Sequence, residues 1–294
     1  MRIAYITFDG IMHYTPANGF NEVEDLLPFL QKKGLDISSE IWDDPNVDWE
    51  QYDVILLKTP WDYHRKFEQF NVWLEKIERL NIKLLNDYLI LRWNMDKHYL
   101  KDIIEAGFNV IPSLFLDQGW KDELEPLFEK LSANKLIVKP CISGGSTNTF
   151  VLSADSIFED KKHVLELISR GDYIVQPFIQ QIKDGEWSFV FLDGQYSHAI
   201  IKKPKAGDFR VQQVFGGTIE IVCPEQKYID YAASYVSAFA GDTLYARVDG
   251  VMVNGKFMLM ELELVEPFLY LSYQPDAVEQ YFQALVQHLA TSIT

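Results

Sequence analysis

Three carboxylates lie within two apolar stretches in the last third of the chain, and their type and spacing suggest metal chemistry. Asp249 belongs to the first stretch, whereas Glu261 and Glu263 belong to the second. A carboxylate placed in a core is costly unless a cation neutralises it. A hard divalent ion such as Mg²⁺, which prefers oxygen ligands, would satisfy all three. The alternative is that the acids pair with Arg247 or with nearby lysines.

The two stretches are typical of a β-hairpin around Asn254-Gly255, and its geometry decides whether the acids can meet. Glu261 and Glu263 are two apart, so they share one face of a strand. The opposite face then carries apolar residues and is expected to be core: Met258, Met260, Leu262 and Leu264. A strict two-residue turn would pair Asp249 with Met260 and point it to the wrong face. The metal hypothesis therefore predicts a bulged or three-residue turn, with Gly255 in the left-handed region.

Two other segments combine a cation with glycine. Lys139 ends an apolar strand and precedes the loop Ser143-Gly144-Gly145-Ser146, whose N–H groups could cradle phosphate oxygens. The motif is neither a P-loop nor a dinucleotide fingerprint, so a plain surface turn stays an alternative. Arg210, in Gly207-Asp-Phe-Arg210, could clamp a phosphate or carboxylate with its planar guanidinium group. The alternative is a solvated loop arginine.

Large aromatic residues stand among polar ones at Trp61-Asp62-Tyr63-His64 and at Arg92-Trp93-Asn94. This mixture suits a small-molecule pocket, although buried core aromatics explain most such cases. His64 and His198 are isolated histidines and are interpreted as structural rather than catalytic. Cys141 and Cys223 show no metal spacing, and neither stands near a histidine that would suggest a nucleophile pair.

Alternating strand and helix patterns must position these segments. In the first third we expect strands at 3–8, 35–42, 54–57 and 82–85, with helices at 21–30 and 67–80. This order predicts an open, mostly parallel sheet whose ligands lie at the carboxyl ends of its strands, here Asp9 and residues 59–64. Further along we expect a helix at 95–106, strands at 110–116, 135–139 and 173–176, a hairpin at 186–202, and helices at 226–240 and 274–289.

Composition excludes several classes of function. The net charge of −16 argues against a broad nucleic-acid footprint, although local cations still permit a phosphate ligand. No apolar run is long enough to span a bilayer, and the first ten residues are typical of a strand rather than a signal peptide. We therefore expect a cytoplasmic protein without nucleic-acid or membrane partners. A homo-oligomer is compatible with the sequence but does not follow from it.

Taken together, residues 89–267 resemble the ATP-grasp superfamily in both motifs and order of elements. The resemblance is to ligases of the ribosomal S6 glutamate ligase and prokaryotic glutathione synthetase type. It is closer still to a bacterial subgroup similar to the O-ureido-D-serine cyclo-ligase of D-cycloserine biosynthesis, and that subgroup's marks include Glu261-Leu-Glu-Leu-Val-Glu-Pro267. This implies an α/β fold in which two α+β subdomains, 91–175 and 176–294, clasp ATP. A Rossmann-like parallel-sheet domain, 1–90, would precede them.

The resemblance also implies roles for individual residues. The implied ATP contacts are Lys97, Lys139, Ser143, Gly144, Gly145, Ser146, Gln176, Pro177, Phe178, Glu186, Lys202, Arg210 and Gln212. The implied metal ligands are Asp249, Glu261 and Glu263, and the implied catalytic residues are Arg210 and Lys139. The acceptor candidates are Asp9, Trp61, Asp62, His64, Arg92, Asn94 and Arg247. Three positions depart from the family pattern: Glu263 and Gln212 stand where Asn is usual, and Pro177 stands where Glu is common.

The implied activity is ATP- and Mg²⁺-dependent ligation. The γ-phosphoryl group would pass to a small carboxylate or amino-acid-like substrate, giving an acyl phosphate. A nitrogen nucleophile would then form the C–N bond, with release of ADP and phosphate. The extra charge of Glu263 favours two divalent ions, and Mn²⁺ could substitute for Mg²⁺. The alternatives are a phosphotransferase that stops at a phosphorylated product and a non-catalytic nucleotide-binding regulator.

Overall fold

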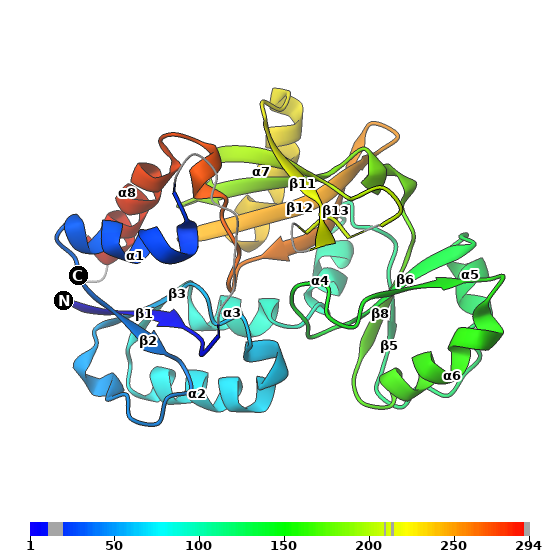
Figure 1. The fold of residues 1–294 in the computed structure, drawn as a ribbon, viewed down its shortest axis with the longest axis horizontal. Coiled ribbons are helices and arrows are strands. Elements are labelled where there is room, and N and C mark those ends of the chain that lie inside the picture. The colour runs from blue at the N-terminus through cyan, green and yellow to red at the C-terminus, as the bar shows by residue number, and fades with distance from the viewer. Residues whose placement is uncertain (11–19, 209, 213–214, 291–294) are drawn as a thin grey trace.

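The chain is built on three β-sheets, which Figure 1 shows side by side along the long axis of the molecule. The computed structural model describes residues 1–10, 20–208, 210–212 and 215–290. Among these residues, no helix is long and apolar enough to cross a membrane.

The first sheet is parallel, as the sequence predicts, with the strand order β2-β1-β3-β4. Its strands are β1 (Arg2–Thr7), β2 (Asp36–Ile41), β3 (Val54–Leu57) and β4 (Lys83–Leu85). All four residues of β3 are buried, as expected for a central strand covered on both faces. One face packs against α1 (Glu22–Lys32) and the C-terminal helix α8 (Ala277–Ala290). The other packs against α2 (Phe67–Arg79) and α3 (Tyr88–Asn94).

The second sheet is antiparallel, with the order β5-β8-β6-β7. Its strands are β5 (Leu114–Leu116), β6 (Lys135–Pro140), β7 (Phe150–Ser153) and β8 (Tyr173–Pro177). The helices α5 (Pro126–Lys130) and α6 (Ile157–Ile168) follow β5 and β7 in the chain, and they lie beside this sheet at the right of Figure 1. This lobe has its own apolar core, which includes Leu127, Leu136 and Ile168.

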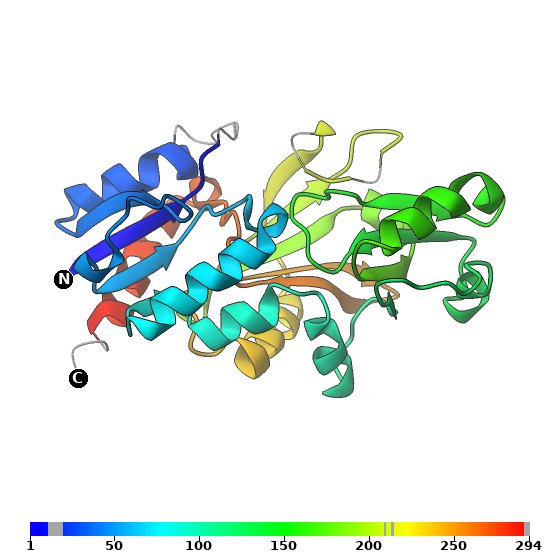
Figure 2. The same cartoon turned by 90° about the horizontal axis from the view of Figure 1, so that it is seen from below.

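The third sheet is also antiparallel, with the order β11-β10-β9-β12-β13. Its strands are β9 (Glu186–Leu192), β10 (Gln195–Lys203), β11 (Thr218–Val222), β12 (Tyr245–Val253) and β13 (Lys256–Glu263). Its core contacts come from α4 (Tyr99–Glu105) and α7 (Gln226–Phe239). Helix α8 shares a core with residues of β9 as well as with the first sheet, and the turned view of Figure 2 places it beside both.

The structure differs from the sequence expectations mainly in short elements. The sequence pattern does not predict helix α3 at residues 88–94, and it also does not predict α5, α6, β7 and β11. Four short 3-10 helices are likewise absent from the prediction: Trp49–Gln51, Tyr63–Arg65, Gln180–Lys183 and Leu271–Tyr273. The expected strand 110–116 is split at Pro112. Val110 bridges Leu259 in the third sheet, whereas β5 belongs to the second. The limits 1–90, 91–175 and 176–294 stay a proposal, and the second limit falls within β8.

Candidate active site

One cavity of about 830 Å³ is lined from all three sheets. Every residue that the sequence assigned to ATP, metal or acceptor lines it except Arg92, and Trp93 of the same segment packs against the core of the third sheet. Arg92 instead points its side chain, 48% exposed, toward Glu75 and the hydroxyl of Tyr88. The expectation that it reaches the acceptor is therefore wrong. Phe209, in the middle of the Gly207 to Arg210 motif, lies outside the described residues.

The β12–β13 hairpin brings Asp249 directly opposite Glu261, but not in the expected way. The turn is the two-residue Asn254-Gly255, and both residues have positive φ, 50° and 75°. Of the two predicted alternatives, the three-residue turn is thus wrong, and the bulge is present but lies within the paired strands rather than at the turn. The register shifts instead between Asp249 and Gly250, where one extra residue of β13 corrects the parity. A Cβ on Gly250 would lie 2.4 Å from the carbonyl oxygen of Met258, so only glycine fits there.

The bulge also changes which side chains share the face of the acids. Leu262 and Leu264 are buried in the core of the third sheet, as expected. Met260 lines the cavity, and Met258 packs with it in a smaller apolar cluster. The expectation that all four residues lie on the core face is wrong for the two methionines. They provide apolar surface close to the acids.

Cations surround Asp249 in the cavity wall. Lys202 Nζ lies 2.9 Å from its Oδ2, Arg247 Nη2 lies 2.9 Å from the same oxygen, and the Ser188 hydroxyl donates to Oδ1 at 2.6 Å. Burial alone would raise the pKa of Asp249, but Arg247 and Lys202 hold it well below its usual range. Lys202 also pairs with Glu186. The buried acid is therefore ionised and already neutralised by protein groups.

The two glutamates differ in their charge partners. Lys139 Nζ lies 2.6 Å from Glu261 Oε1, and Lys139 and Lys97 outweigh burial and lower the pKa of Glu261 to about 2. Glu263 pairs with Arg247. Burial nevertheless raises the pKa of Glu263 to about 7, and Asp249 and Glu261 add to the effect. Pairing with cations, the alternative to a metal, is thus present in the structure.

The donor set still fits a hard divalent ion. Asp249 and Glu261 face each other across the hairpin, Glu263 follows on the same strand, and all three line the cavity. They offer only carboxylate oxygens, the ligands that Mg²⁺ prefers. Their side chains end in ion pairs that an incoming cation could exchange. We keep their assignment as metal ligands as a proposal.

The glycine-rich loop is held at three points around the cavity. Lys97 Nζ donates to the carbonyl oxygen of Ser143 at 3.1 Å and lies 3.2 Å from its hydroxyl. Gln212 Nε2 donates to the Ser146 hydroxyl at 2.8 Å. A Cβ on Gly144 would lie 3.1 Å from His64 Nδ1, so the loop packs closely on that ring. The loop between β6 and β7 therefore contacts His64 of the first domain, Lys97 before α4, and Gln212 between β10 and β11.

His64 is an unusual member of the lining. Both ring nitrogens are buried without a hydrogen-bond partner among the described residues. Burial lowers the pKa of its imidazole, and the positive charges of Arg65 and Lys97 lower it further. The ring is therefore neutral near pH 7. Arg210, on another wall, pairs with Asp208 at 2.8 Å and stacks on Phe215 at 3.8 Å.

Two of the acceptor candidates are fully engaged within the protein. Asp62 accepts from Trp42 Nε1 at 2.8 Å and pairs with Lys66 at 2.7 Å. The amide of Asn94 spans Glu263. It donates to the carbonyl oxygen of Leu262 at 2.7 Å and accepts from the N–H of Leu264 at 2.9 Å. We interpret both side chains as positioning groups, since their polar atoms already have partners.

The segment 176–178, which is expected to bind adenine, also makes hydrogen bonds within the protein. The N–H of Phe178 donates to the carbonyl oxygen of Lys135 at 2.9 Å, and Gln176 Nε2 donates to the Ser113 hydroxyl at 2.9 Å. Nearby apolar side chains that sequence reasoning missed also line the cavity: Ile111, Ile137, Ile182, Val211 and Met260. They are single residues from separate elements, so no local pattern marks them.

Tyr63, from the predicted aromatic segment, lines the first-domain end of the cavity, and two further aromatic residues and one acid there were not among the candidates: Phe8, Phe268 and Glu266. Glu266 follows Glu263 by three residues. Burial raises the pKa of its carboxyl group to about 8, and the nearby charge of Glu263 contributes to the rise. Its position three residues beyond the acid pair was the signal that could have found it.

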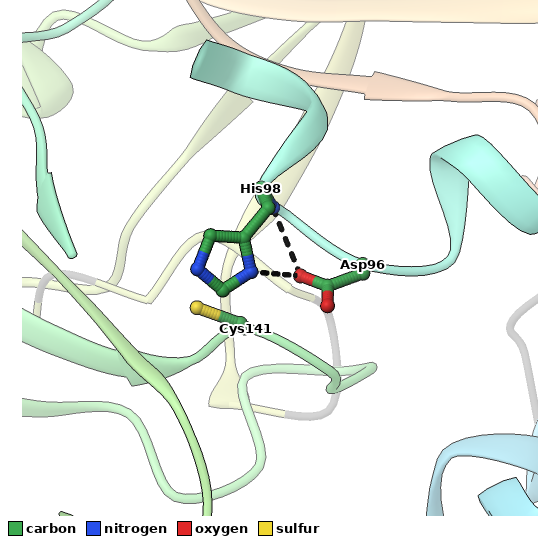
Figure 3. A group of neighbouring side chains, drawn as sticks. All are labelled: Asp96, His98 and Cys141. Atoms are coloured by element: carbon green, nitrogen blue, oxygen red, sulfur yellow. Dashed lines mark hydrogen bonds and ion pairs between the residues drawn. The ribbon is translucent and has the colours of Figure 1, made fainter. Parts of the chain in front are cut away.

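A separate group of potential metal ligands, Asp96, His98 and Cys141, lies beside the loop (Figure 3). The Asp96 carboxylate meets His98 Nδ1 at 2.7 Å, and the Cys141 sulfur lies on the other side of the ring. The expectation that neither cysteine stands near a histidine is wrong for Cys141. Burial raises the pKa of its thiol to about 12, so it is protonated and unreactive. The group ties β6 to the start of α4, next to Lys97.

Comparison with known proteins matches both parts of the chain. The profile of the N-terminal domain of D-cycloserine synthetase DcsG matches residues 3–86. The profile of the ATP-grasp domain of prokaryotic glutathione synthetase matches residues 116–255. Cycloserine biosynthesis protein DcsG of Streptomyces lavendulae is 26% identical over 289 residues, which cover 90% of this chain and 94% of that protein.

Two solved structures extend this similarity to the whole fold. The crystal structure of D-cycloserine synthetase DcsG matches with a TM-score of 0.82 and 26% identity, covering 98% of this chain and 100% of that one. D-alanine–D-alanine ligase from Bacillus anthracis, complexed with ATP, matches with a TM-score of 0.67 and covers 100% of this chain and 97% of that one. At 17% identity, the second match shows a shared fold alone.

Proposed function

Because this chain belongs to the ATP-grasp ligase superfamily, we propose that its cavity activates a small carboxylate or amino-acid-like substrate with ATP and then joins it to nitrogen. The γ-phosphoryl group would move to a carboxylate oxygen, giving an acyl phosphate and ADP. A nitrogen nucleophile would then attack the acyl carbon, and phosphate would leave with the C–O bond electrons. The observation that carries this proposal is the meeting of the three acids, Lys139 and the glycine-rich loop in one cavity.

The proposed roles follow from charge and position. Lys97 and Lys139 would neutralise phosphate oxygens, and Arg210 would bind the transferring group with its planar fork. The glycine-rich loop would cover the phosphates and keep water away from the acyl phosphate. The apolar lining near Gln176, Pro177 and Phe178 would hold the adenine ring.

The carboxylates of Asp249, Glu261 and Glu263 would hold the divalent metal, for which we propose Mg²⁺. The charge of the third acid favours the binding of two ions, and Mn²⁺ could substitute for Mg²⁺. When bound, the metal would neutralise the β- and γ-phosphates. The three acids then need the neighbouring cations less, so Lys139 and Arg247 would become available to the substrate phosphates. This exchange of partners requires no change in the net charge of the protein.

The test is Mg²⁺-dependent ADP release in the presence of a panel of amino acids and small carboxylates. Arg210→Ala should lower turnover by about 10²–10³-fold, because a charge-assisted contact to the transferring group is lost. Mass analysis of the products separates a ligase from a phosphotransferase that stops at the phosphorylated compound. Tight ATP binding without turnover, unaffected by Arg210→Ala, would instead indicate a nucleotide-binding regulator.

A further inference from the structure

Glu266 has a half-buried carboxyl group in the cavity wall, and no cationic side chain of the described residues pairs with it directly. No hydrogen bond or ion pair joins its carboxylate to any residue in the described part of the chain. The cavity cations nearest to the acid cluster are occupied elsewhere. Lys139 pairs with Glu261, and Arg247 pairs with Asp249 and Glu263. An anion held in a partly desolvated wall without a partner is unfavourable, unless a ligand supplies the opposite charge.

The backbone around Glu266 is held in place from several sides. Trp61 Nε1 donates to the carbonyl oxygen of Glu266 itself at 3.1 Å. Lys58 Nζ donates to the carbonyl oxygen of Pro267 at 3.3 Å, and Arg247 Nη1 donates to that of Phe268 at 2.8 Å. A side chain on such a segment is pre-organised, so that its charge is presented at a fixed place.

The surroundings of Glu266 favour a compact organic cation. Trp61 and Phe8 both line the cavity, and their rings lie 6.2 Å apart at an interplanar angle of 58°. Tyr63 lines the same end of the cavity. Aromatic faces attract ammonium groups, and a carboxylate provides the matching hydrogen-bond acceptors.

We propose that Glu266 binds the ammonium group of the acceptor, so that the enzyme selects primary-amine substrates of the amino-acid class. This inference rests on the proposed function, because it places the acceptor at the first-domain end of the cavity. Glu266 acts in this role as a specificity-determining residue. The pKa of its carboxyl group is raised because burial and the charges of Glu263 and Glu261 outweigh those of Lys97 and Arg247, and a bound ammonium group would lower that pKa.

The experiment measures binding separately from turnover. The probes are matched pairs that differ only at the amine, namely alanine with lactate and serine with glycerate, in both enantiomers. Each is titrated by calorimetry into the full chain saturated with Mg²⁺ and a non-hydrolysable ATP analogue. We expect the native protein to bind the amino acid of at least one pair about 10–100-fold more tightly than its hydroxy acid. Glu266→Gln should reduce that ratio to within about threefold.

Two controls separate this role from others. Glu105→Gln, an exposed substitution at the end of α4, should keep the native ratio. Mg²⁺ titration of ADP binding should be the same in Glu266→Gln as in the native protein. A loss of Mg²⁺ affinity in Glu266→Gln like that of Glu261→Gln would overturn the inference, since Glu266 would then be a metal ligand.

The remaining outcomes are also decisive. Equal binding of the amino and hydroxy acids by the native protein, or no binding of any probe, would overturn the ammonium role of Glu266. Amine-selective binding that depends on Glu266, but without ADP release from ATP, would keep the inference and contradict the proposed ligase activity. A failure of the ammonium-binding role of Glu266 and a failure of the proposed ligase activity are therefore distinguishable in one set of samples.

Discussion

Lys139 Nζ and Glu261 Oε1 lie 2.6 Å apart, and this ion pair joins β6 of the second sheet to β13 of the third. The lysine is a proposed phosphate contact and the glutamate a proposed metal ligand. The pair therefore holds, in the ligand-free protein, the two groups that Mg²⁺ and ATP would each require. Binding of the nucleotide and of the metal should consequently be coupled, because each frees the partner of the other.

The first prediction concerns that coupling. Glu261→Gln should weaken the effect of Mg²⁺ on nucleotide binding and lower turnover by about 10²–10³-fold, since a ligand of the ion that would neutralise the reacting phosphates is lost. Calorimetric titration of ADP at several Mg²⁺ concentrations measures the coupling directly. Nucleotide binding that keeps its native Mg²⁺ dependence in this variant would remove Glu261 from the ligand set.

The second prediction concerns the bulge in the hairpin. In Gly250→Ala the new methyl group would lie 2.4 Å from the Met258 carbonyl oxygen and 2.5 Å from the Phe257 ring. We expect a loss of about 1–3 kcal/mol in the free energy of unfolding, with loss of turnover because Asp249 and Glu261 shift out of register. Gly171→Ala, where no atom lies within 4 Å, is the matched control. Equal urea midpoints for the two variants would contradict the assigned role of the bulge.

The third prediction concerns the contact between the loop and the first domain. Gly144→Ala should press on the His64 ring, which lies 3.1 Å from the new methyl group. We expect a several-fold higher KM for ATP with little change in unfolding free energy. The double variant His64→Ala/Gly144→Ala removes the obstacle, so its KM for ATP should fall back toward that of His64→Ala alone. No recovery in steady-state kinetics would mean that the loop is displaced for another reason.

The fourth prediction concerns pH. Burial and the nearby charge of Glu263 raise the pKa of Glu266 to about 8, although Lys97 and Arg247 oppose the shift. Because the folded state holds this proton more tightly than the unfolded state, stability should fall as the pH rises from about 5 to 8. Glu266→Gln should remove that part of the slope in urea unfolding of the ligand-free protein. An amine ligand needs the ionised carboxylate, so its affinity should instead increase toward pH 8.

The fifth prediction concerns a buried ion pair behind the site. Lys58 Nζ lies 2.5 Å from Glu22 Oε1, and the two side chains are 3% and 1% exposed. Glu22 also accepts from the N–H groups of Leu269 and Leu271. Lys58→Met should cost about 3–5 kcal/mol, because it leaves a buried charge without its cation. Adding Glu22→Gln should recover part of this loss in urea unfolding, and a double variant less stable than Lys58→Met would contradict the explanation.

The longer helices and strands were predictable from the sequence, because the spacing of their apolar residues reflects which face of each element is buried. The apolar run 54–57 has the features of a central parallel strand, and the structure confirms it as β3. The motif residues also converge on one cavity, but only Asp9 and residues 61–64 do so because loops after neighbouring parallel strands meet at one edge of a sheet. The short elements β7 and β11 were missed, because four or five residues carry too little periodicity to be distinguished from a loop.

The errors at the site have specific physical causes. Gly250 inside an apolar strand is a bulge signal, but a longer turn at Asn254-Gly255 would correct the register equally well, and a single sequence does not distinguish the two. Arg92 and Asn94 were grouped as one motif, yet in a helix residues two apart point to different faces, so only Asn94 reaches the cavity. Cys141 and His98 meet only through tertiary packing between β6 and α4. A single sequence does not reveal such a contact at 43 residues' separation.

The separate core of the second sheet has a mechanical consequence. Helix α8 packs on both the first and the third sheets, so these two form one base. The core that includes Leu127, Leu136 and Ile168 contains, among the described residues, only residues of the second lobe. Cys141 and Ile174 of this lobe nevertheless pack in the core of the third sheet. A swing of the lobe about the chain crossings near Pro112 and Phe178 would therefore have to release these two side chains while leaving its own core intact. Such a swing would carry Lys139 and the glycine-rich loop together, while Glu266 and the three acids stay fixed on the base.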